Sequence, residues 1–273
     1  QLTSTGGNAL QFSGVGNYVT IPSAINTQFS ANRITLEGWY FQTAPTVGNP
    51  ALVGEAYMGD GTVKFSMYLS GQQVVAGFFS GTWITAASTA NLPLNTWTHI
   101  AATYDQTAIR IYINGVAAGS FAATSVLPVA SEEWRLARRW DNAEYFAGRM
   151  DEVRIWNVAR TQPQISAGMS AVIAPSTSGL VAYYRLDEGA GINTADLTGH
   201  GYSGTFVASP VWVIPSTAPL AGYAAYHWSN GGSTPGITVN AAGSYSVTVT
   251  DLYGCSGVSA PVALDDRTHP WQS

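Results

Sequence analysis

Three pairs of adjacent carboxylates are the groups of this chain that come closest to an acid–base catalyst: Glu132–Glu133, Asp151–Glu152 and Asp187–Glu188. Neighbouring side chains of a β-strand point to opposite faces, so such a pair cannot flank one glycosidic bond as a glycosidase requires. The histidines lie in separate segments without H-x-x-x-H or H-E-x-x-H spacing, at His99, His200, His227 and His269. The sequence also lacks a G-x-S-x-G turn and a phosphate-binding glycine-rich loop. These patterns predict a protein that is not an enzyme.

A polar loop rich in aromatic residues is the better candidate for chemistry, in this case ligand binding. The run RRWDNAEY contains Trp140, Asp141, Asn142 and Tyr145. An aromatic ring offers a flat apolar face to the C–H side of a sugar, and Asp or Asn side chains fix its hydroxyls. The loop therefore predicts a glycan contact. Trp83 and Tyr57 are further candidate aromatics, and the alternative reading is that Trp140 and Trp134 only cover the edges of a sheet.

Strands are the elements that must position this loop. Apolar and polar residues alternate along most of the chain, as in residues 34–41, with turn signals at short intervals. Asn114–Gly115, between two runs of β-formers, predicts a tight hairpin. The chain is therefore expected to be all-β, as an antiparallel meander and not a βαβ fold.

One short helix is expected near residues 161–169. Thr161 and Gln164 have the spacing of a capping box, in which each side chain accepts a hydrogen bond from a backbone N–H of the first helical turn. Ile165 and Met169, four residues apart, would pack one face of this helix on the sheets. The alternative is a single turn that ends at Gly168.

Three segments carry a family resemblance. They are ALQFSGVGNYVTI (9–21), WTHIAATYDQTAIRIYINGVAAG (97–119) and AGRMDEVRIW (147–156). In this order they resemble a laminin-G-like, concanavalin A-like jelly roll that covers roughly residues 8–215. The resemblance implies a sandwich in which residues 9–21 and 147–156 supply the first and last strands. It also implies a binding protein, because the glycosidases of this fold carry an E-x-D-x-E strand that this chain lacks.

The resemblance further implies a structural calcium ion that joins the corner after the first strand to the last strand. Asp151 matches the family position that gives the carboxylate, and Ser13, Gly14 and Asn17 lie in the corner. Calcium prefers six to eight oxygen ligands, including backbone carbonyls. Ser13 and Asn17 stand where the family more often has acidic residues, which lowers the charge of the site. The alternative is that Asp151 caps the corner without a metal.

Residues 179–206 resemble a stretch that precedes the first strand in many laminin-G-like sequences, yet here the stretch follows the last strand. It either completes the same jelly roll or opens a repeat whose remainder is missing. Residues 226–256 resemble the last strands of immunoglobulin-like repeats in large secreted proteins of Bacteroidetes. We therefore expect a jelly roll over residues 1–218, a partial immunoglobulin-like unit over residues 219–265 and an exposed tail over residues 266–273.

The C-terminal unit is the predicted site of self-association. Its alternating apolar residues, among them Val247 and Val249, need a second layer to face. A full immunoglobulin-like sandwich has about seven strands, and a short unit buries too little to fold securely alone. The missing layer would come from the jelly roll, from a neighbouring subunit or from sequence outside these residues. We expect residues 219–265 to make the main contact with a neighbouring subunit.

Composition restricts the partners. Only 10% of the 273 residues are charged and the net charge is −5, so the chain lacks the basic surface of a nucleic-acid-binding protein. No apolar run approaches the ~20 residues of a membrane helix, and no membrane insertion is expected. The single cysteine forms no disulfide within the chain. No signal segment is present, and the chain begins at Gln1. The chain is therefore interpreted as a mature or trimmed extracellular protein, located at a bacterial cell surface.

Two functions remain open from the sequence. The first is a non-catalytic extracellular recognition or adhesion module that binds a glycan or a cell-surface protein. The second is a structural subunit of a self-assembling extracellular filament or surface layer, since an unpaired sheet edge can accept a strand from another chain.

Overall fold

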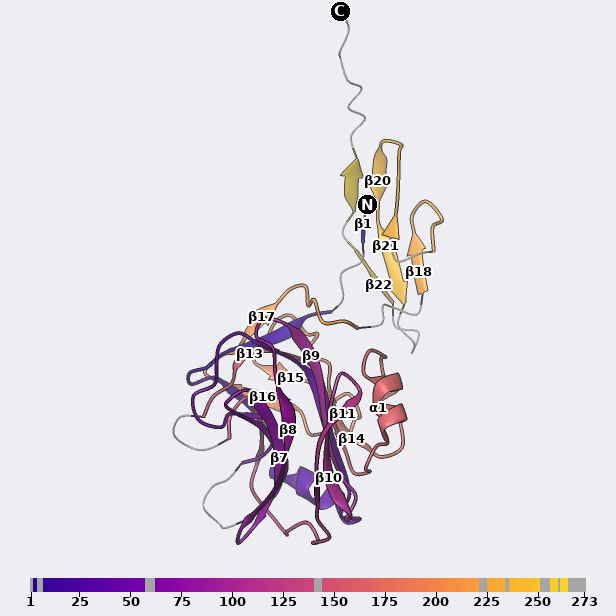
Figure 1. Cartoon of the computed structure of the whole chain (residues 1–273). Helices are drawn as coiled ribbons and strands as arrows, with labels where there is room; N and C mark the ends of the chain where they lie inside the picture. The colour runs from indigo at the N-terminus through magenta and orange to yellow at the C-terminus, as the bar shows by residue number, and fades with distance from the viewer. Residues whose placement is uncertain are drawn as a thin grey trace, which may run out of the picture. The chain divides into compact units, whose positions relative to one another are not determined.

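The computed structural model describes residues 2–3, 7–56, 62–139, 144–220, 225–233, 236–250, 256–259 and 261–264. The chain divides into two compact units, one of Gly7–Pro219 and one of Gln1–Gly6 with Leu220–Ser273 (Figure 1). The prediction placed residues 1–218 together. In the structure, however, strand β1 (Leu2–Thr3) pairs with β19 (Gly236–Ile237), so the second unit includes a strand from the N-terminal segment.

The larger unit is a sandwich of two antiparallel sheets. Sheet I has the order β11-β10-β9-β4-β13-β2-β17, and β14 also pairs with β13. Its strands are β2 (Ala9–Ser13), β4 (Ile34–Gln42), β9 (Trp97–Tyr104), β10 (Ala108–Ile113), β11 (Val116–Ala122), β13 (Ala147–Trp156), β14 (Leu180–Tyr184) and β17 (Val211–Val213).

Sheet II has the order β15-β16-β3-β12-β5-β6-β7-β8. Its strands are β3 (Tyr18–Ile21), β5 (Ala51–Glu55), β6 (Thr62–Ser70), β7 (Gln73–Ser80), β8 (Trp83–Asn91), β12 (Trp134–Leu136), β15 (Asn193–Thr194) and β16 (Gly204–Val207). The inner faces of sheets I and II enclose one hydrophobic core. Its largest fully buried side chains include Phe12, Tyr40, Phe65, Phe78, Tyr104, Trp134 and Phe146. The predicted all-β jelly roll is confirmed.

The first and last strands of the expected jelly roll lie next to each other. β2 and β13 are antiparallel neighbours, with Ala147 opposite Ser13 and Met150 opposite Leu10. The corner that follows β2 depends on glycine, because Gly14 and Gly16 have φ values of 81° and 78°, in the left-handed region that glycine adopts without strain. The Asn114–Gly115 hairpin between β10 and β11 is also confirmed.

Residues 179–206 complete the same sandwich and do not open a separate repeat. β14 pairs with β13 in sheet I, and β16 pairs with β3 in sheet II. The apolar alternation of this stretch is thereby covered, since Leu180, Ala182, Tyr184 and Leu186 are all buried. This pairing agrees with the first of the two alternatives left open by the sequence.

The predicted helix is α1 (Gln162–Gly168), and its capping box is present. Thr161 accepts a hydrogen bond from the Gln164 backbone N–H, and the Gln164 side chain accepts one from the Thr161 N–H. Ile165 is fully buried against Ala101 and Tyr112 of sheet I. A 3₁₀ helix, η1 (Ser23–Gln28), was not predicted, because it buries only Ile25 and has no side-chain cap.

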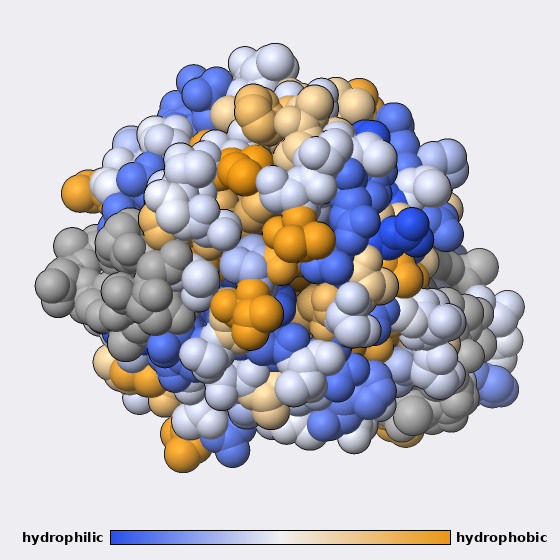
Figure 2. Space-filling model, turned by 90° about the horizontal axis from the view of Figure 1, so that it is seen from below, coloured by the Kyte–Doolittle hydropathy of each residue, from blue (hydrophilic) through white to orange (hydrophobic). Residues whose placement is uncertain are grey.

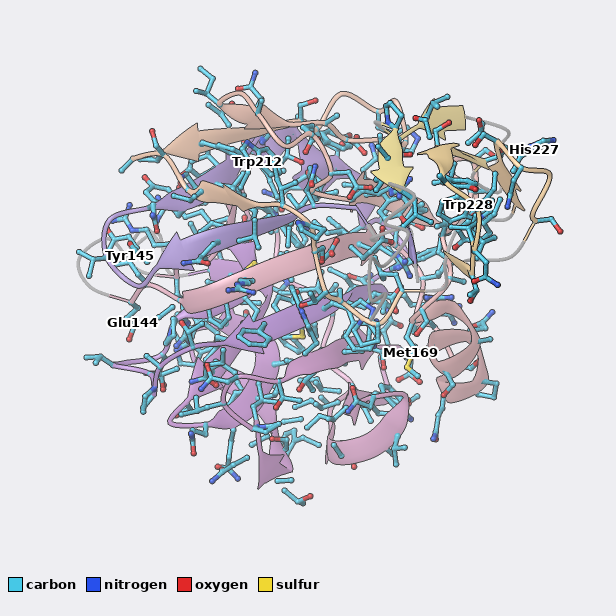
Figure 3. All side chains as sticks on the ribbon, turned by 90° about the horizontal axis from the view of Figure 1, so that it is seen from above. Glu144, Tyr145, Met169, Trp212, His227 and Trp228 are labelled. Carbon is cyan, nitrogen blue, oxygen red and sulfur yellow. The ribbon has the colours of Figure 1, made fainter. Side chains whose placement is uncertain are left out.

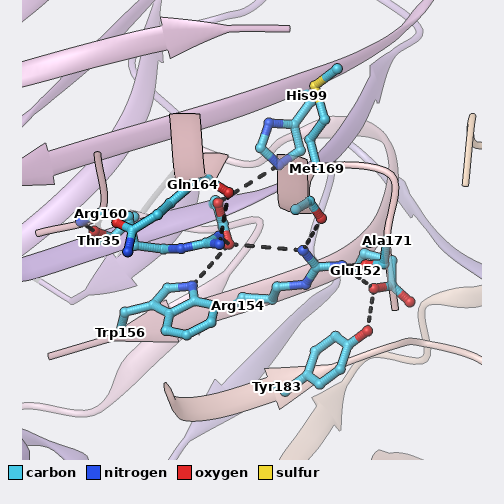
Figure 4. Close-up of polar contacts among 12 residues, drawn as sticks. Thr35, His99, Glu152, Arg154, Trp156, Arg160, Gln164, Met169, Ala171 and Tyr183 are labelled. Atoms are coloured by element: carbon cyan, nitrogen blue, oxygen red, sulfur yellow. Dashed lines mark hydrogen bonds and ion pairs between the residues drawn. The ribbon is translucent and has the colours of Figure 1, made fainter. Parts of the chain in front are cut away.

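A buried polar network fixes the segment of α1 to the outer face of sheet I (Figure 4). Arg154 of β13 donates hydrogen bonds to the backbone carbonyls of Gly168 (2.8 Å) and Ala171 (2.7 Å). It also donates to Glu152 Oε2 at 2.5 Å. Glu37 Oε1 accepts from Arg160 at 2.5 Å and from the Trp156 indole at 2.9 Å. Arg154 thus binds the carbonyl of the last residue of α1 and that of Ala171, three residues beyond the helix.

The tryptophans of the larger unit differ in burial. Trp39 and Trp156 are buried, but Trp97 is only half-buried and donates to the Thr217 hydroxyl at the surface. Trp134 is fully buried and stacks on Phe29, with 5.3 Å between the ring centroids. Trp134 is therefore a core residue and neither covers an edge nor contacts a ligand.

The second unit contains short strands and a core of its own. Its remaining strands are β18 (Ala225–Trp228), β20 (Gly243–Tyr245), β21 (Val247–Thr250), β22 (Ser256–Val258) and β23 (Val262–Leu264). They form a β18-β21-β22 sheet and a β20-β23 pair. Val247 packs on Tyr226, Trp228 and Ile237 of the same unit. The expectation that Val247 lacks a layer within its own chain is wrong, and the side chain of Val249 lies outside the described residues. The immunoglobulin-like resemblance stays a prediction.

Figure 2 shows one face of the molecule, on which hydrophobic residues occur in small groups between polar ones. Neither helix in the described part of the chain has the length and hydrophobicity needed to span a lipid bilayer.

Candidate functional site: a cleft on the outer face of sheet II

A cleft of about 500 Å³ lies on the outer face of strands β6, β7 and β8. Its position follows from the two-residue period of these strands. Met67, Val74 and Ala86 are examples of side chains that point into the core, so the residues between such positions point outward. The strands contribute Tyr68, Ser70, Gln73, Val75, Trp83, Thr85 and Ala87 to the cleft, and flanking segments add Asn49, Arg139 and Glu144.

The close packing of strands β7 and β8 in sheet II requires glycine at position 77. A Cβ atom added at Gly77 would lie 2.0 Å from the carbonyl oxygen of Ile84 and 2.8 Å from the Thr85 Cα. Any larger residue would therefore push β8 away from β7. The close approach of these strands keeps Thr85 and Trp83 of β8 beside the outward residues of β7.

Arg139 lies against the two aromatic rings of the cleft. Its guanidinium carbon is 3.7 Å from the centroid of the Tyr68 ring and 4.5 Å from that of Trp83. Burial lowers the pKa of Arg139, while Tyr68 and the Glu144 carboxylate raise it. Burial raises the pKa of Tyr68, which Arg139 counteracts. The cation thus lies over both rings and close to one anion.

Glu144 connects the segment after β12 with the loop before β5. Its Oε1 accepts hydrogen bonds from the Asn49 backbone N–H (3.0 Å) and side-chain amide (3.4 Å). Its Oε2 is buried and has no hydrogen-bond partner among the described residues. Figure 3 shows Glu144 beside Tyr145 at the edge of the sandwich, on the side away from α1 and Met169. One carboxylate oxygen at the cleft is therefore a buried acceptor without a donor among the described residues.

Of the four residues predicted to bind a ligand, Trp140, Asp141 and Asn142 lie outside the described residues. Tyr145 is half-buried and forms an isolated bridge with Arg138. The Arg138 guanidinium carbon lies 4.6 Å from the Tyr18 ring centroid and 5.2 Å from that of Tyr145. Tyr145 therefore belongs to a neighbouring cation–π group and does not line the cleft, although Glu144 next to it does.

The four residues predicted to bind calcium do not come together. Ser13 lies opposite Ala147, and Asp151 is four residues further along β13, about 13 Å at 3.3 Å per residue. The Asn17 amide oxygen accepts from the Ser13 backbone N–H (2.9 Å), and the Ser13 hydroxyl donates to the Val15 carbonyl (2.8 Å). The corner is thus stabilised by its own hydrogen bonds, and one ion cannot bind Asp151, Ser13, Gly14 and Asn17 together.

Asp151 lies in a different polar environment. It is fully buried, its Oδ2 accepts from the Ser216 hydroxyl at 2.6 Å, and its Oδ1 has no partner among the described residues. Burial raises the pKa of Asp151 well above its usual value, and the charges of Glu152 and Asp187 add to this. The described residues contain no group of three or more His, Cys, Asp or Glu side chains suited to a metal. Calcium binding at Asp151 stays a prediction.

The cleft strands were missed as a site because their outward side chains look like core residues. Trp83 was a candidate, but Tyr68 and Val75 are apolar and alternate with other apolar residues. Which face is buried depends on the pairing of β6, β7 and β8. Besides Trp83, the sequence feature that could have indicated an outward-facing site was the set of polar residues Ser70, Gln73 and Thr85.

Comparison with known proteins shows the fold. The structure is similar to that of a candidate carbohydrate-binding protein from Bacteroides ovatus, with a TM-score of 0.64 and 23% identity, over 80% of this chain and 62% of that chain. A second similar structure is domain 4 of AbnA, a GH43 extracellular arabinanase from Geobacillus stearothermophilus, in complex with arabinotriose (TM-score 0.48, 22% identity, 58% and 75% of the two chains). A third is Trypanosoma rangeli sialidase (TM-score 0.45, 16% identity, 57% and 26%).

Sequence comparison identifies the family. A search of curated proteins gave no match. The family model described as the concanavalin A-like lectin/glucanases superfamily matches residues 13–166, more than half of the chain. The match includes every strand from β3 to β13, and with them the cleft strands β6, β7 and β8. The resemblance seen in the sequence is confirmed, and the chain belongs to the concanavalin A-like lectin/glucanases superfamily.

Proposed function

We propose that this protein is a non-catalytic extracellular module that binds a glycan in the cleft of sheet II. The observation that carries the proposal is the lining of this cleft, which combines aromatic rings with hydroxyl, amide and carboxylate groups. Its volume of about 500 Å³ lies within the range of small-ligand pockets. The name of the Bacteroides ovatus relative supports the same function.

Catalysis is not part of the proposal. Among the described residues that line the cleft, Glu144 is the single carboxylate, whereas glycoside hydrolysis normally needs two that flank the bond. We therefore expect binding without release of reducing ends from any glycan that binds. Turnover that disappears when Glu144 is replaced would contradict this part of the proposal.

The test is a glycan-binding screen with a blocked cleft. Thr85 lies half-exposed in the cleft, and Thr85→Trp places a large ring among the lining residues without lowering the β-propensity of β8. Thr20→Trp is the matched control, since Thr20 is also half-exposed on sheet II but lies on β3, outside the cleft. We expect glycan binding to be lost in Thr85→Trp and kept in Thr20→Trp. Equal binding by both variants would exclude the cleft as the site.

The extracellular location and a cell-surface protein as an alternative partner rest on the sequence resemblances alone. Detection of the native protein in the culture medium or the cell-surface fraction tests the location. If the glycan screen is negative, cross-linking on intact cells distinguishes a protein partner from no partner.

A second candidate function is that of a subunit in an extracellular filament or layer. Val258 of β22 and Val262 and Leu264 of β23 are exposed by 69%, 49% and 41%. β22 and β23 lie at the edges of their sheets, and exposed apolar residues on an edge strand favour pairing with another chain. Sedimentation at increasing concentration tests this, with Val262→Lys/Leu264→Lys against the control Val15→Lys in the β2–β3 corner. Assembly that Val262→Lys/Leu264→Lys alone abolishes would support this function, and a monomer at all concentrations would exclude it.

A further inference from the structure

The charged groups of the cleft indicate which class of sugar it can accept. Arg139 and Glu144 are the charged side chains among the lining residues that the structure describes. The chain's single lysine, Lys64, lies elsewhere, because its Nζ donates to the carbonyl of Pro128 at 3.1 Å. Any attraction of the cleft for an acidic sugar would therefore have to come from Arg139.

Arg139 is poorly placed to bind an anion. It is 5% exposed, and its guanidinium lies over the rings of Tyr68 and Trp83. Its charge also interacts with the Glu144 carboxylate. Because so little of Arg139 is exposed, its N–H edge offers an incoming carboxylate or sulfate little access, and the anion would have to approach Glu144. The net charge of −5 on the chain adds a long-range repulsion of anions.

Glu144, in contrast, favours an uncharged hydroxyl donor over an anion. Its Oε1 is occupied by two hydrogen bonds from Asn49, and its buried Oε2 has no partner among the described residues. A buried acceptor without a donor is destabilising, so native structures nearly always supply a partner, often water or a ligand. A sugar hydroxyl can donate to Oε2, whereas an ionised carboxylate or sulfate has no hydrogen to donate.

The other polar groups of the cleft suit hydroxyls as well. Ser70 and Thr85 contribute hydroxyls, and Gln73 and Asn49 contribute amides. Both kinds of group can donate and accept, as sugar hydroxyls do. We infer that the cleft binds uncharged, hydroxyl-rich sugar units through the free Oε2 of Glu144 and discriminates against uronic and sulfated sugars. This inference rests on the proposed glycan-binding function.

The test compares neutral and acidic polysaccharides on one array, using galactan, mannan and β-glucan, whose sugar units carry free primary hydroxyls, against polygalacturonate, alginate and heparin. A neutral glycan that binds is then oxidised at its primary hydroxyls to carboxylates and measured again. We expect at least one neutral glycan to bind and its oxidised form to bind at least tenfold more weakly. Equal binding of the two forms would overturn the inference.

Glu144→Gln adds a readout that a structural role would not give. The Asn49 donors fix the amide oxygen at the Oε1 position, so the amide nitrogen replaces the acceptor Oε2. We expect about tenfold weaker binding of the neutral glycan, the loss of one hydrogen bond to a charged group, and a smaller discrimination against its oxidised form. Glu188→Gln is the control, because the exposed Glu188 accepts from Thr194 and Ala195 outside the cleft.

The outcomes separate the inference from the proposed function. If acidic glycans bind and neutral ones do not, with binding lost in Arg139→Met, the inference is wrong while the glycan-binding function stands. If no glycan of either class binds, the proposed function fails and the inference fails with it. Unchanged neutral binding in Glu144→Gln would also overturn the inference.

Discussion

Removal of Arg154 is the sharpest test of how the sandwich is held together. The Arg154 side chain is fully buried under the α1 segment, where it donates to two backbone carbonyls and to Glu152 (Figure 4). Burial alone would lower the pKa of Arg154, but Glu152, Tyr183 and Glu37 outweigh that effect and raise it. The guanidinium therefore stays charged, and Arg154→Met removes both the charge and the hydrogen bonds while keeping an unbranched side chain of similar reach.

The expected loss of stability follows from the carboxylates that Arg154→Met leaves without this cation. Glu152 keeps a hydrogen bond from the Tyr183 hydroxyl and an ion pair with Arg185 at 3.3 Å. Glu37 keeps its ion pair with Arg160. Each carboxylate loses the buried Arg154 cation, at 2.5 Å from Glu152 and 3.8 Å from Glu37. Breaking one side of a buried ion pair costs about 3–5 kcal/mol. For a domain of this size, about 2–4 °C of melting temperature corresponds to each kcal/mol, so the expected loss is roughly 6–20 °C.

Guanidinium chloride unfolding and thermal melting measure the loss, and Arg149→Met is the control. Arg149 lies on the same strand but is half-buried, and it donates to the Gln11 side chain at 3.2 Å. We expect the control to lose less than about 1 kcal/mol. Adding Glu152→Gln to Arg154→Met should restore part of the stability, because it removes a buried charge that has lost its nearest cation. A loss below about 1 kcal/mol for Arg154→Met, or no recovery in the double variant, would refute the reasoning.

Three other perturbations test the pH dependence, the metal content and the packing of the sandwich. Burial raises the pKa of Glu55 to about 7, above the unfolded value of about 4.3. Between these pH values the folded state holds a proton that the unfolded state has lost, so stability falls as the pH rises. By urea unfolding, the stability of the wild type relative to Glu55→Gln should fall by roughly 3 kcal/mol between pH 4 and pH 8. Calcium at a hundredfold excess over its dissociation constant should stabilise the wild type by about 2.7 kcal/mol but not Asp151→Ala, and a melting temperature unmoved by chelator would contradict calcium binding. Gly77→Ala should destabilise by about 1–3 kcal/mol, because the new Cβ would lie 2.0 Å from a carbonyl oxygen of β8; a stability equal to the wild type would show that β7 and β8 can separate freely.

Local chemistry made some elements predictable from the sequence. The capping box of Thr161 and Gln164 and the Asn114–Gly115 turn depend on residues only a few positions apart, and both are present. The adjacency of β2 and β13 followed from the family resemblance and not from local pattern. The 3₁₀ helix η1 carries neither a cap nor a periodic apolar face, so its sequence gave no comparable signal.

The candidate sites were harder to predict because they depend on register. Asp151 and Ser13 are on neighbouring strands, yet the pairing of β2 with β13 separates them by four positions. The cleft depends on which face of β6, β7 and β8 is buried, and Tyr68 and Val75 are apolar on the outward face. Glu144 and Arg139 flank the predicted aromatic loop and line the cleft, so the sequence indicated the correct segment but not the residues that contribute to the cleft.

The use of charge links the fold to the proposed ligand. The sequence has 11 basic and 16 acidic residues, and nine of them are buried in the described part of the chain, at Glu37, Glu55, Lys64, Arg135, Arg139, Asp151, Glu152, Arg154 and Asp196. Buried charges here fix segments to the sheets, as Arg154 does for the residues after α1. The outer surface is left with hydroxyl and amide groups in place of many charges. Such a surface matches neutral sugar hydroxyls better than it matches a polyanion, which is the discrimination that the paired neutral and oxidised glycans measure.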